Sequence, residues 1–357
     1  MDLTRLVDHV RPTATLVAWL HEANDRSDNP AVMRLATILL RRHRLSLEDR
    51  FLALSRRARA RLDTGDYAGS DRDGVAASEL RPDDADTWHN LGIARERRYL
   101  DSEAAECFER ALELSPVADD YVWLTACRHY TGEADKALVA VDRAVALDPA
   151  NAHAWRWRAS LQSKLDLTQA VEDASRAIQL ESENSREMRR SRAVWLVRLA
   201  RYAEAIAEYN ALLEDEPADV SLHVARAYTR QRARDFDGAI DGYAWAYALA
   251  PHDLYSGLRR ISLMHRVGRT KQALQLAREE TLHRADSFEA WHVLARAERL
   301  AGDPAEALAS IDRAIALMPG RLALRQCYER ILILAVAGRA AEARALRENV
   351  KEKVRCA

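Results

Sequence analysis

Arginine is the residue type with the greatest capacity for chemistry in this sequence, with 49 copies against five lysines among 357 residues. A guanidinium group grips carboxylates through two parallel hydrogen bonds and stacks on aromatic rings, so arginine beside aromatic residues is typical of binding surfaces. Basic residues also recur at a spacing of 34, as Lys164, Arg198, Arg232 and Arg266. A spacing of this length indicates that one local structure is repeated along the chain. We therefore expect binding on long faces made by stacked repeats rather than in a single pocket.

The motifs of common catalytic sites are absent from the sequence, which contains no HExxH, GxSxG, GxxxxGK or GxGxxG. The eleven histidines never pair at i, i+4 with a third ligand. The segment 69–74, GSDRDG, is similar to a calcium loop, but Gly69 and Leu80 stand where the first ligand and the final carboxylate are needed. Acid pairs such as Asp71 and Asp73 are expected on helix surfaces, without a pocket to shift their pKa values. We predict no catalytic residues, no metal and no cofactor, and hence no enzyme.

A repeat of about 34 residues runs through most of the chain. Six of the nine prolines are separated by 34, 33, 68, 34 and 68 residues: Pro82, Pro116, Pro149, Pro217, Pro251 and Pro319. An alanine series runs in phase with them: Ala104, Ala137, Ala170, Ala205, Ala239, Ala273, Ala307 and Ala343. Within residues 86–116 the apolar spacing predicts two antiparallel helices, which approach closely over Ala104. Proline ends the second helix because it lacks an N–H group and disfavours helix in the residue before it.

The sequence resembles the tetratricopeptide-repeat family at its signature places. In one unit these are Trp88, Leu91, Gly92, Ala104, Phe108, Ala111 and Pro116; in others they are Gly132, Ala137, Ala144 and Pro149, and Trp291, Gly302, Ala307, Ala314 and Pro319. The resemblance implies an all-α, right-handed α-solenoid of stacked helix-turn-helix repeats. Eight repeats are expected to open near Phe51, Ala85, Ala118, Ala152, Arg186, Val220, Leu254 and Phe288, with a further helix pair from Leu324.

This register divides the chain into an N-terminal helical cap (1–50), eight repeats (51–323) and a C-terminal helix pair with a capping helix (324–357). In the cap, Thr13 and Asn29 are predicted N-caps, and Ser46 with Asp49 is a capping-box variant before the first repeat. An alternative use of residues 1–50 is as an element for homodimer formation or partner binding. Two glycines, at positions 69 and 74, are expected to weaken the second helix of the first repeat.

The composition limits the expected cellular location of the protein and the classes of partner that it could bind. The net charge of −1 argues against general affinity for nucleic acid or acidic membranes. No apolar run approaches the ~20 residues that a membrane span needs, and the start of the chain lacks the build of a signal peptide. The cysteines, at positions 107, 127, 327 and 356, show no CxxC spacing, which favours reduced thiols in a cytosol. We expect a cytoplasmic protein, and the excess of arginine over lysine suggests a GC-rich bacterial genome.

The resemblance also implies where a ligand would bind, because in this family the first helix of each repeat lines the concave face. The ligand-facing places are the second, fifth, sixth, ninth, twelfth and thirteenth of each repeat. In this sequence they give the following predicted groove residues: Arg56, Arg59, Asn90, Arg97, Trp123, Arg156, Trp157, Lys164, Arg190, Arg198, Tyr228, Arg232, Arg259, Arg266, His292 and Arg296. At the fifth, sixth and ninth places the eight repeats hold six arginines and no acid.

Some of these charges have structural explanations. Bases at helix ends complement the helix dipole, which is worth ~0.3–1 kcal/mol each. The dipole effect is confined to the helix ends, so it does not explain the mid-helix residues Arg156, Arg190 and Arg259. These three are therefore predicted to act on a ligand. A second arginine set is predicted to be structural, with buried stems and acidic partners such as Asp173 or Asp241 in second helices. Its members are Arg57, Arg158, Arg192, Arg226 and Arg260.

One mechanism known in the family, the carboxylate clamp of its chaperone-binding members, is not supported. Asn90 suits the middle asparagine of that clamp. The flanking places hold Ser55 with Arg59 and Asp119 with Trp123, where the clamp needs lysine, asparagine and arginine.

We therefore predict a non-catalytic scaffold that binds an acidic or carboxylate-bearing segment of another protein in a concave groove of arginine and aromatic residues. Nucleic acid is not an expected partner. Two alternatives remain open at this stage. The first is a regulatory protein that senses a peptide and transmits the change through residues 1–50. The second is a dedicated assembly or secretion chaperone.

Overall fold

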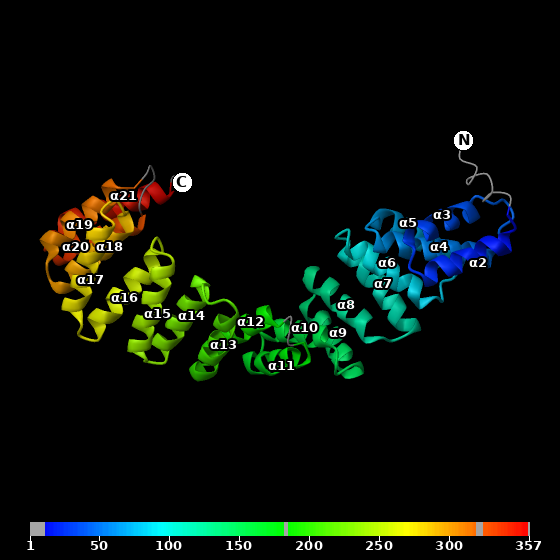
Figure 1. Ribbon diagram of the computed structural model, residues 1–357, viewed down its shortest axis with the longest axis horizontal. Coiled ribbons are helices and arrows are strands. Elements are labelled where there is room, and N and C mark those ends of the chain that lie inside the picture. Colours follow the sequence, from blue (N-terminus) through cyan, green and yellow to red (C-terminus); the bar gives the residue numbers. More distant parts are fainter. Residues whose placement is uncertain (1–10, 182–184, 319–323, 356–357) are drawn as a thin grey trace. The chain divides into compact units, whose positions relative to one another are not determined.

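A computed structural model describes residues 11–181, 185–318 and 324–355, and these ranges contain helices and no strand (Figure 1). The first two helices are α2 (Thr13–Asp25) and α3 (Asn29–Leu40). Nine helix pairs follow. The first helices of the pairs are α4 (Leu47–Asp63), α6 (Ala85–Glu96), α8 (Ala118–Tyr130), α10 (Ala152–Gln162), α12 (Arg186–Arg198), α14 (Val220–Arg232), α16 (Leu254–Arg266), α18 (Phe288–Ala301) and α20 (Leu324–Val336). The second helices are α5 (Tyr67–Leu80), α7 (Asp101–Leu114), α9 (Ala134–Leu147), α11 (Leu167–Leu180), α13 (Tyr202–Asp215), α15 (Phe236–Leu249), α17 (Thr270–His283), α19 (Pro304–Ala316) and α21 (Ala340–Arg355).

The starts of the first helices follow the repeat period. From α6 to α20 each begins at the residue that the period predicts. The exception is α4, which begins at Leu47 rather than near Phe51, because Ser46 caps it: the Ser46 Oγ accepts a hydrogen bond from the Asp49 N–H at 3.0 Å. Pro319, which is predicted to end the eighth repeat, lies outside the described residues, as does Cys356.

The alanine series is buried, as the close approach of the two helices requires. In the described helices Ala104, Ala137, Ala170, Ala205, Ala239 and Ala307 have no exposed surface, and Ala273 and Ala343 are also buried. Larger side chains fill the space between pairs, for example Phe108 and Tyr243, both fully buried. The small residue at the helix crossing and the large residues around it together form the core of each repeat.

The chain divides into two compact units, residues 1–188 (unit 1) and 189–357 (unit 2). Within unit 1, α4 contacts α6, α6 contacts α8 and α8 contacts α10; within unit 2, α16 contacts α18 and α18 contacts α20. The first helices therefore touch one another in a layer from α4 to α10 in unit 1 and from α16 to α20 in unit 2. None of the described helices is long and apolar enough to cross a membrane.

The two N-terminal helices pack on the first repeat. Leu16 and Leu20 of α2 and Leu35 of α3 are buried in one cluster with Ala53 and Ala60 of α4.

The capping residues at this end differ from the prediction. The cap of α3 is Asp28, whose Oδ1 accepts a hydrogen bond from the Ala31 N–H at 3.1 Å, and Asn29 is the first helical residue. A proline at position 30 fits this arrangement, since the first turn of a helix does not need its N–H group. Thr13 lies inside α2 and accepts a hydrogen bond from Arg42 at 2.8 Å instead of capping.

The second helix of the first repeat, α5, is continuous from Tyr67 to Leu80 although it contains Gly69 and Gly74. A Cβ added to Gly74 would lie 3.2 Å from Leu91 Cδ1. Glycine at this position therefore allows α5 and α6 to approach closely, and this packing outweighs its low helix propensity.

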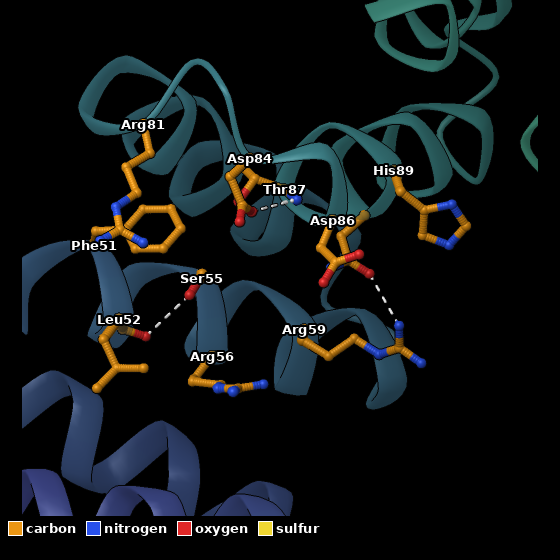
Figure 2. Close-up of a pocket in the computed structure, with 11 residues that line it drawn as sticks. Phe51, Leu52, Ser55, Arg56, Arg59, Arg81, Asp84, Asp86, Thr87 and His89 are labelled. Atoms are coloured by element: carbon orange, nitrogen blue, oxygen red, sulfur yellow. Dashed lines mark hydrogen bonds between the residues drawn. The ribbon is translucent and has the colours of Figure 1, made fainter. Parts of the chain in front are cut away.

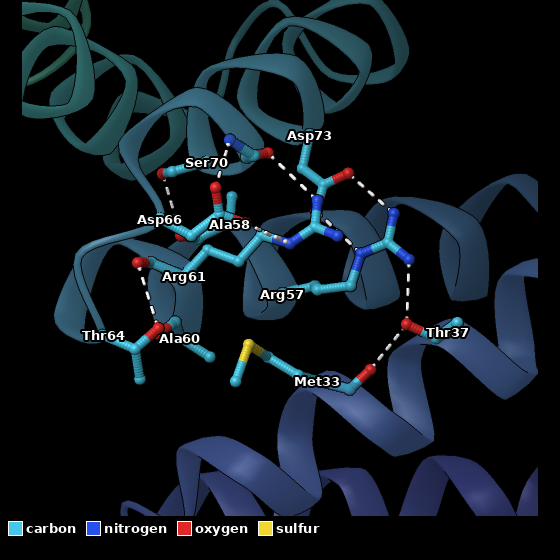
Figure 3. A network of polar contacts seen from close by, with 11 residues as sticks. Met33, Thr37, Arg57, Ala58, Ala60, Arg61, Thr64, Asp66, Ser70 and Asp73 are labelled. Atoms are coloured by element: carbon cyan, nitrogen blue, oxygen red, sulfur yellow. Dashed lines mark hydrogen bonds and ion pairs between the residues drawn. The ribbon is translucent and has the colours of Figure 1, made fainter. Parts of the chain in front are cut away.

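Three members of the second arginine set, Arg57, Arg158 and Arg192, bind an acid of the second helix in their own repeat, as predicted, and Figure 3 shows Arg57. Arg57 binds both carboxylate oxygens of the buried Asp73 at 2.7 Å, and Arg61 binds the same carboxylate at 2.8 Å. The remaining guanidinium nitrogen of Arg57 donates to the Thr37 Oγ1 at 3.0 Å, which links α3, α4 and α5. In the fourth repeat Arg158 binds Asp173 in the same bidentate way, at 2.8 and 2.9 Å.

Later members of the set have fewer acidic partners. Arg192 pairs with Glu208, 16 residues further on, as Arg57 does with Asp73. The same place after Arg226 and Arg260 holds Gly242 and Leu276. Burial therefore lowers the pKa of both guanidinium groups.

A left-handed residue stands in the turn of nearly every helix pair. The fifteenth place of eight pairs has φ between 60° and 92°: Gly65, Tyr99, Gly132, Ala200, Arg234, Gly268, Gly302 and Gly338. The fourth pair differs because its turn is one residue shorter, and Asp166 there has φ −136° and caps α11. At three of these places a residue with a Cβ occupies a conformation that favours glycine.

We predict that Arg234→Gly raises the free energy of unfolding by about 0.5–1 kcal/mol, because glycine adopts the φ of 65° without strain. The neighbouring Ala233 has φ −72°, so Ala233→Gly is the matched control and should lower stability by a similar amount. Urea denaturation of the two variants measures the difference. If both variants shift the midpoint in the same direction, the turn does not store this strain.

Candidate functional site

A hollow of about 540 Å³ lies between α4, α6 and the turn that joins α5 to α6 (Figure 2). It is lined by Phe51, Leu52, Ser55, Arg56, Arg59, Arg81, Asp84, Asp86, Thr87, His89 and Asn90. Three of the four predicted groove residues of the first two repeats, Arg56, Arg59 and Asn90, thus line one hollow, and Arg97 does not.

Three guanidinium groups line this hollow, and they differ in how many contacts they make with other residues of the chain. The Arg56 Nε is buried and has no hydrogen-bond partner among the described residues. Arg59 donates to the Asn90 Oδ1 at 3.0 Å and to Asp63 at 3.1 Å, yet its side chain remains 53% exposed. Arg81 lies 4.7 Å over the ring of Phe51. Arg56 is therefore the group whose hydrogen-bonding capacity is least satisfied.

Of the two acids that line the hollow, Asp84 is engaged in hydrogen bonds and Asp86 is exposed. Asp84 caps α6, accepting hydrogen bonds from the N–H and the hydroxyl of Thr87 at 2.9 and 2.6 Å. Its charge is therefore held at the positive end of the helix dipole. His89 forms a hydrogen bond with Asp120 of the next repeat. Among the acids that line the hollow, Asp86 is exposed to solvent.

A second pocket, of about 370 Å³, lies further along the same layer of helices, where α6, α8 and α10 meet. We refer to it as the aromatic pocket, and its lining residues are Glu96, Asp119, Val122, Trp123, Ala126, Tyr130, His153 and Trp157. Trp123 stacks on the buried Phe108, with ring centroids 6.2 Å apart, and Arg97 lies 5.6 Å over the Trp123 ring. Three predicted groove residues, Arg97, Trp123 and Trp157, therefore meet here.

The sequence reasoning missed Tyr130 as a member of this pocket. Its ring makes an edge contact with Trp157, at 6.2 Å between centroids, and its side chain is 64% exposed. Tyr130 stands at the thirteenth place of its repeat, as Lys164 and Arg232 do in theirs. Its place in the repeat could therefore have identified it as a groove residue. Arg156 lines an adjoining hollow of about 300 Å³ and approaches Glu181 at 3.7 Å.

In unit 2, several predicted groove arginines are paired within the chain. Arg190 contacts Glu216 at 2.9 Å and Asp219 at 2.6 Å. Arg296 donates to Ser262 at 2.9 Å and approaches Glu329 at 3.2 Å. Ion pairs within the chain therefore explain why Arg190 and Arg296 are basic, although they lie too far from the helix ends to interact with the helix dipole.

Other predicted groove residues of unit 2 rest on aromatic rings. Arg232 lies 5.9 Å over Tyr202 and donates to the Tyr228 hydroxyl at 3.2 Å. Arg266 lies 4.9 Å over Phe236, the corresponding residue of the next repeat, and Arg259 lies 5.1 Å over Tyr255. Lys164 in unit 1 and Arg198 in unit 2 are exposed.

His292 does not lie on the surface where it was predicted. Its side chain is 2% exposed, enclosed in the core of α18. The fifth place of a first helix faces the groove in other repeats, but at this position the ring contributes to packing. We therefore remove His292 from the candidate site. Within the described ranges, no group of three or more His, Cys, Asp or Glu residues is arranged to hold a metal ion.

Comparisons with solved structures relate this fold to tetratricopeptide-repeat (TPR) proteins. The C-terminal part of a TPR repeat-containing protein from Cytophaga hutchinsonii matches with a TM-score of 0.55 and 13% identity, over 77% of this chain and 98% of that chain. A TPR protein from Parabacteroides merdae gives 0.45 and 16%, over 80% and 98%. YrrB, described as a TPR protein with an unusual peptide-binding site, gives 0.47 and 18%, over 51% and 95%. No family model and no curated protein sequence matches the chain.

The pairing of Arg190 leads to a prediction about Asp219. Burial alone would raise the pKa of the Asp219 carboxyl, but hydrogen bonds from Ser221, Arg190 and the Leu222 N–H lower it to about 2. A lowered folded-state pKa stabilises the fold above the ordinary value of about 3.9, and this contribution is lost as the pH falls through about 2.

We expect Arg190→Ala to raise the pKa of Asp219, though not to its ordinary value, because Ser221 and Leu222 still donate. The variant should then lose less of its remaining stability between pH 4 and pH 2. NMR titration of the Asp219 carboxyl carbon measures this, and Arg198→Ala, which removes an exposed arginine of the same helix, is the control. An unchanged pKa in Arg190→Ala would mean that this ion pair does not form in solution.

Proposed function

Because this chain is a tetratricopeptide-repeat solenoid, we propose that it is a non-catalytic protein-interaction scaffold whose α4–α6 hollow binds a carboxylate-bearing segment of another protein. The observation that carries the proposal is the Arg56 Nε, which is buried beside the hollow without a hydrogen-bond partner among the described residues. A buried N–H group without a partner costs free energy, and an incoming carboxylate would satisfy it.

The neighbouring groups favour the same ligand. The Arg59 guanidinium points from α4 towards α6 and keeps half of its side chain exposed while bound to Asn90 (Figure 2). Within the described residues its Nη2 makes no hydrogen bond, so it can donate to an anion. Arginine and carboxylate groups form short, charge-assisted hydrogen bonds, often two in parallel. Two guanidinium groups three residues apart on α4 can therefore hold an acidic segment.

The helices hold the side chains around the hollow in place before a ligand binds. Phe51, Leu52 and Thr87 are among its lining residues, and Arg56 and Arg59 both lie on the helix α4. Residues on rigid helices lose little freedom when a ligand binds, which favours affinity. The proposed partner is an acidic peptide segment presented by another protein.

We predict that an acetylated, amidated peptide with three consecutive aspartates between glycines binds unit 1, and that its asparagine counterpart does not. Arg56→Gln with Arg59→Gln should weaken binding at least about tenfold, since each charge-assisted hydrogen bond contributes ~1.5–3 kcal/mol. Isothermal titration calorimetry with the full chain measures both affinities.

The matched control is Arg72→Gln, which removes one positive charge from an exposed place on α5 away from the hollow. It should bind the aspartate peptide like the parent protein, and binding to the parent should fall as salt rises. Equal affinity of the Arg56/Arg59 double variant and the parent would overturn the proposal. Equal binding of the asparagine peptide would also overturn it, because the recognition would then not depend on charge.

A further inference from the structure

The aromatic pocket differs from the α4–α6 hollow in the sign of its charge. Its lining contains two carboxylates, from Glu96 and Asp119, and no lysine or arginine. Its walls are the rings of Trp123, Tyr130 and Trp157. An anionic segment that fits the first hollow would be repelled here, so this pocket needs a ligand of different chemistry.

The two carboxylates retain hydrogen-bonding capacity. The Glu96 Oε2 is buried and accepts no hydrogen bond within the described residues, and the nearest cationic atom is the Arg97 Nε at 3.7 Å. Asp119 accepts one hydrogen bond, from the Asn151 side chain at 2.9 Å, and it is otherwise exposed at the first turn of α8. A buried carboxylate oxygen without a donor is costly, and a cationic donor satisfies it best.

The aromatic rings favour a cation as well. The face of an indole or phenol ring carries partial negative charge and attracts ammonium and guanidinium groups. The chain itself supplies an example at this place, because Arg97 lies 5.6 Å over Trp123 while its Nε approaches Glu96. The other indole of the pocket, Trp157, has Tyr130 and His129 at its edges, with centroids at 6.2 and 5.5 Å.

The surrounding bases do not cancel this preference. Arg97 lies over Trp123 and near Glu96 but is not part of the pocket lining, and Arg156 lines the adjoining hollow, where it approaches Glu181. The His153 ring, which is shared by both hollows, is exposed.

We propose that the aromatic pocket between α8 and α10 binds the cationic side chain of a lysine or arginine in a partner peptide. The ammonium or guanidinium group would contact the rings of Trp157 and Tyr130 and donate hydrogen bonds to Glu96 and Asp119. Val122 and Ala126 are small enough to leave space for the aliphatic stem. This goes beyond the proposed function, since it assigns a second pocket with the opposite charge preference, and it does not depend on carboxylate binding at the α4–α6 hollow.

The test uses two acetylated, amidated pentapeptides on the ¹⁵N-labelled full chain, Gly-Gly-Lys-Gly-Gly and the same peptide with norleucine in place of lysine. Norleucine keeps the apolar stem and removes the charge. The lysine peptide should shift the indole Nε1–H signals of Trp123 and Trp157, which Trp123→Phe and Trp157→Phe identify. We expect it to bind at least about tenfold more tightly than the norleucine peptide. Equal affinities would overturn the proposal and leave an uncharged apolar pocket.

The variants separate this proposal from the previous one. Glu96→Gln with Asp119→Asn keeps the shapes of both side chains and should weaken lysine-peptide binding at least about tenfold. Glu103→Gln, at an exposed place on α7, is the charge control and should bind like the parent. Arg56→Gln with Arg59→Gln should also leave lysine-peptide binding unchanged. Undiminished binding by the Glu96/Asp119 double variant, with far-UV circular dichroism unchanged, would overturn the assignment.

Discussion

The close contact of two helices over a buried alanine is the constraint on which the rest of this structure depends. Ala104, Ala137 and Ala239 have no exposed surface, so nothing larger fits where the helices of their pairs cross. This contact fixes the angle within each pair and leaves one side of each first helix to meet the first helix of the next repeat. Both candidate pockets of unit 1 are formed between such neighbouring first helices, which means that backbone packing positions their side chains.

Local features could be predicted from the sequence because each one repeats. The period placed the starts of α6 to α20, and the spacing within a repeat paired Arg57 with an acid of the following helix. The partners of Arg190 and Arg296 could not be read in this way. Asp219 caps α14 and Glu329 lies in α20, so each arginine pairs with an acid at the first helix of the following pair rather than in the second helix of its own repeat. Burial of His292 escaped prediction for the same reason, since a place that faces solvent in one repeat is covered in another.

Charge is distributed unevenly within unit 1 although the whole chain is nearly neutral. The α4–α6 hollow presents Arg56 and Arg59, whereas the aromatic pocket presents Glu96 and Asp119. A net charge of −1 therefore describes a balance between local surfaces of opposite sign and does not describe any one of them. The predicted groove of arginine and aromatic residues gave the whole inner face one charge preference. The two pockets differ because the charge of each depends on which repeats lie next to each other.

Three tryptophans near the starts of first helices, Trp88, Trp155 and Trp291, are hydrogen-bonded to the backbone of the preceding turn, at residues 82, 149 and 285. The indole Nε1 of Trp88, Trp155 and Trp291 donates to a main-chain carbonyl at 3.0, 2.9 and 2.9 Å, and the His223 ring takes the same role at 2.8 Å. Each indole therefore reports on whether its own turn remains closed. Three variants that each retain only one of these tryptophans would carry an intrinsic fluorophore that registers local opening in the second, fourth or eighth repeat, without any attached dye.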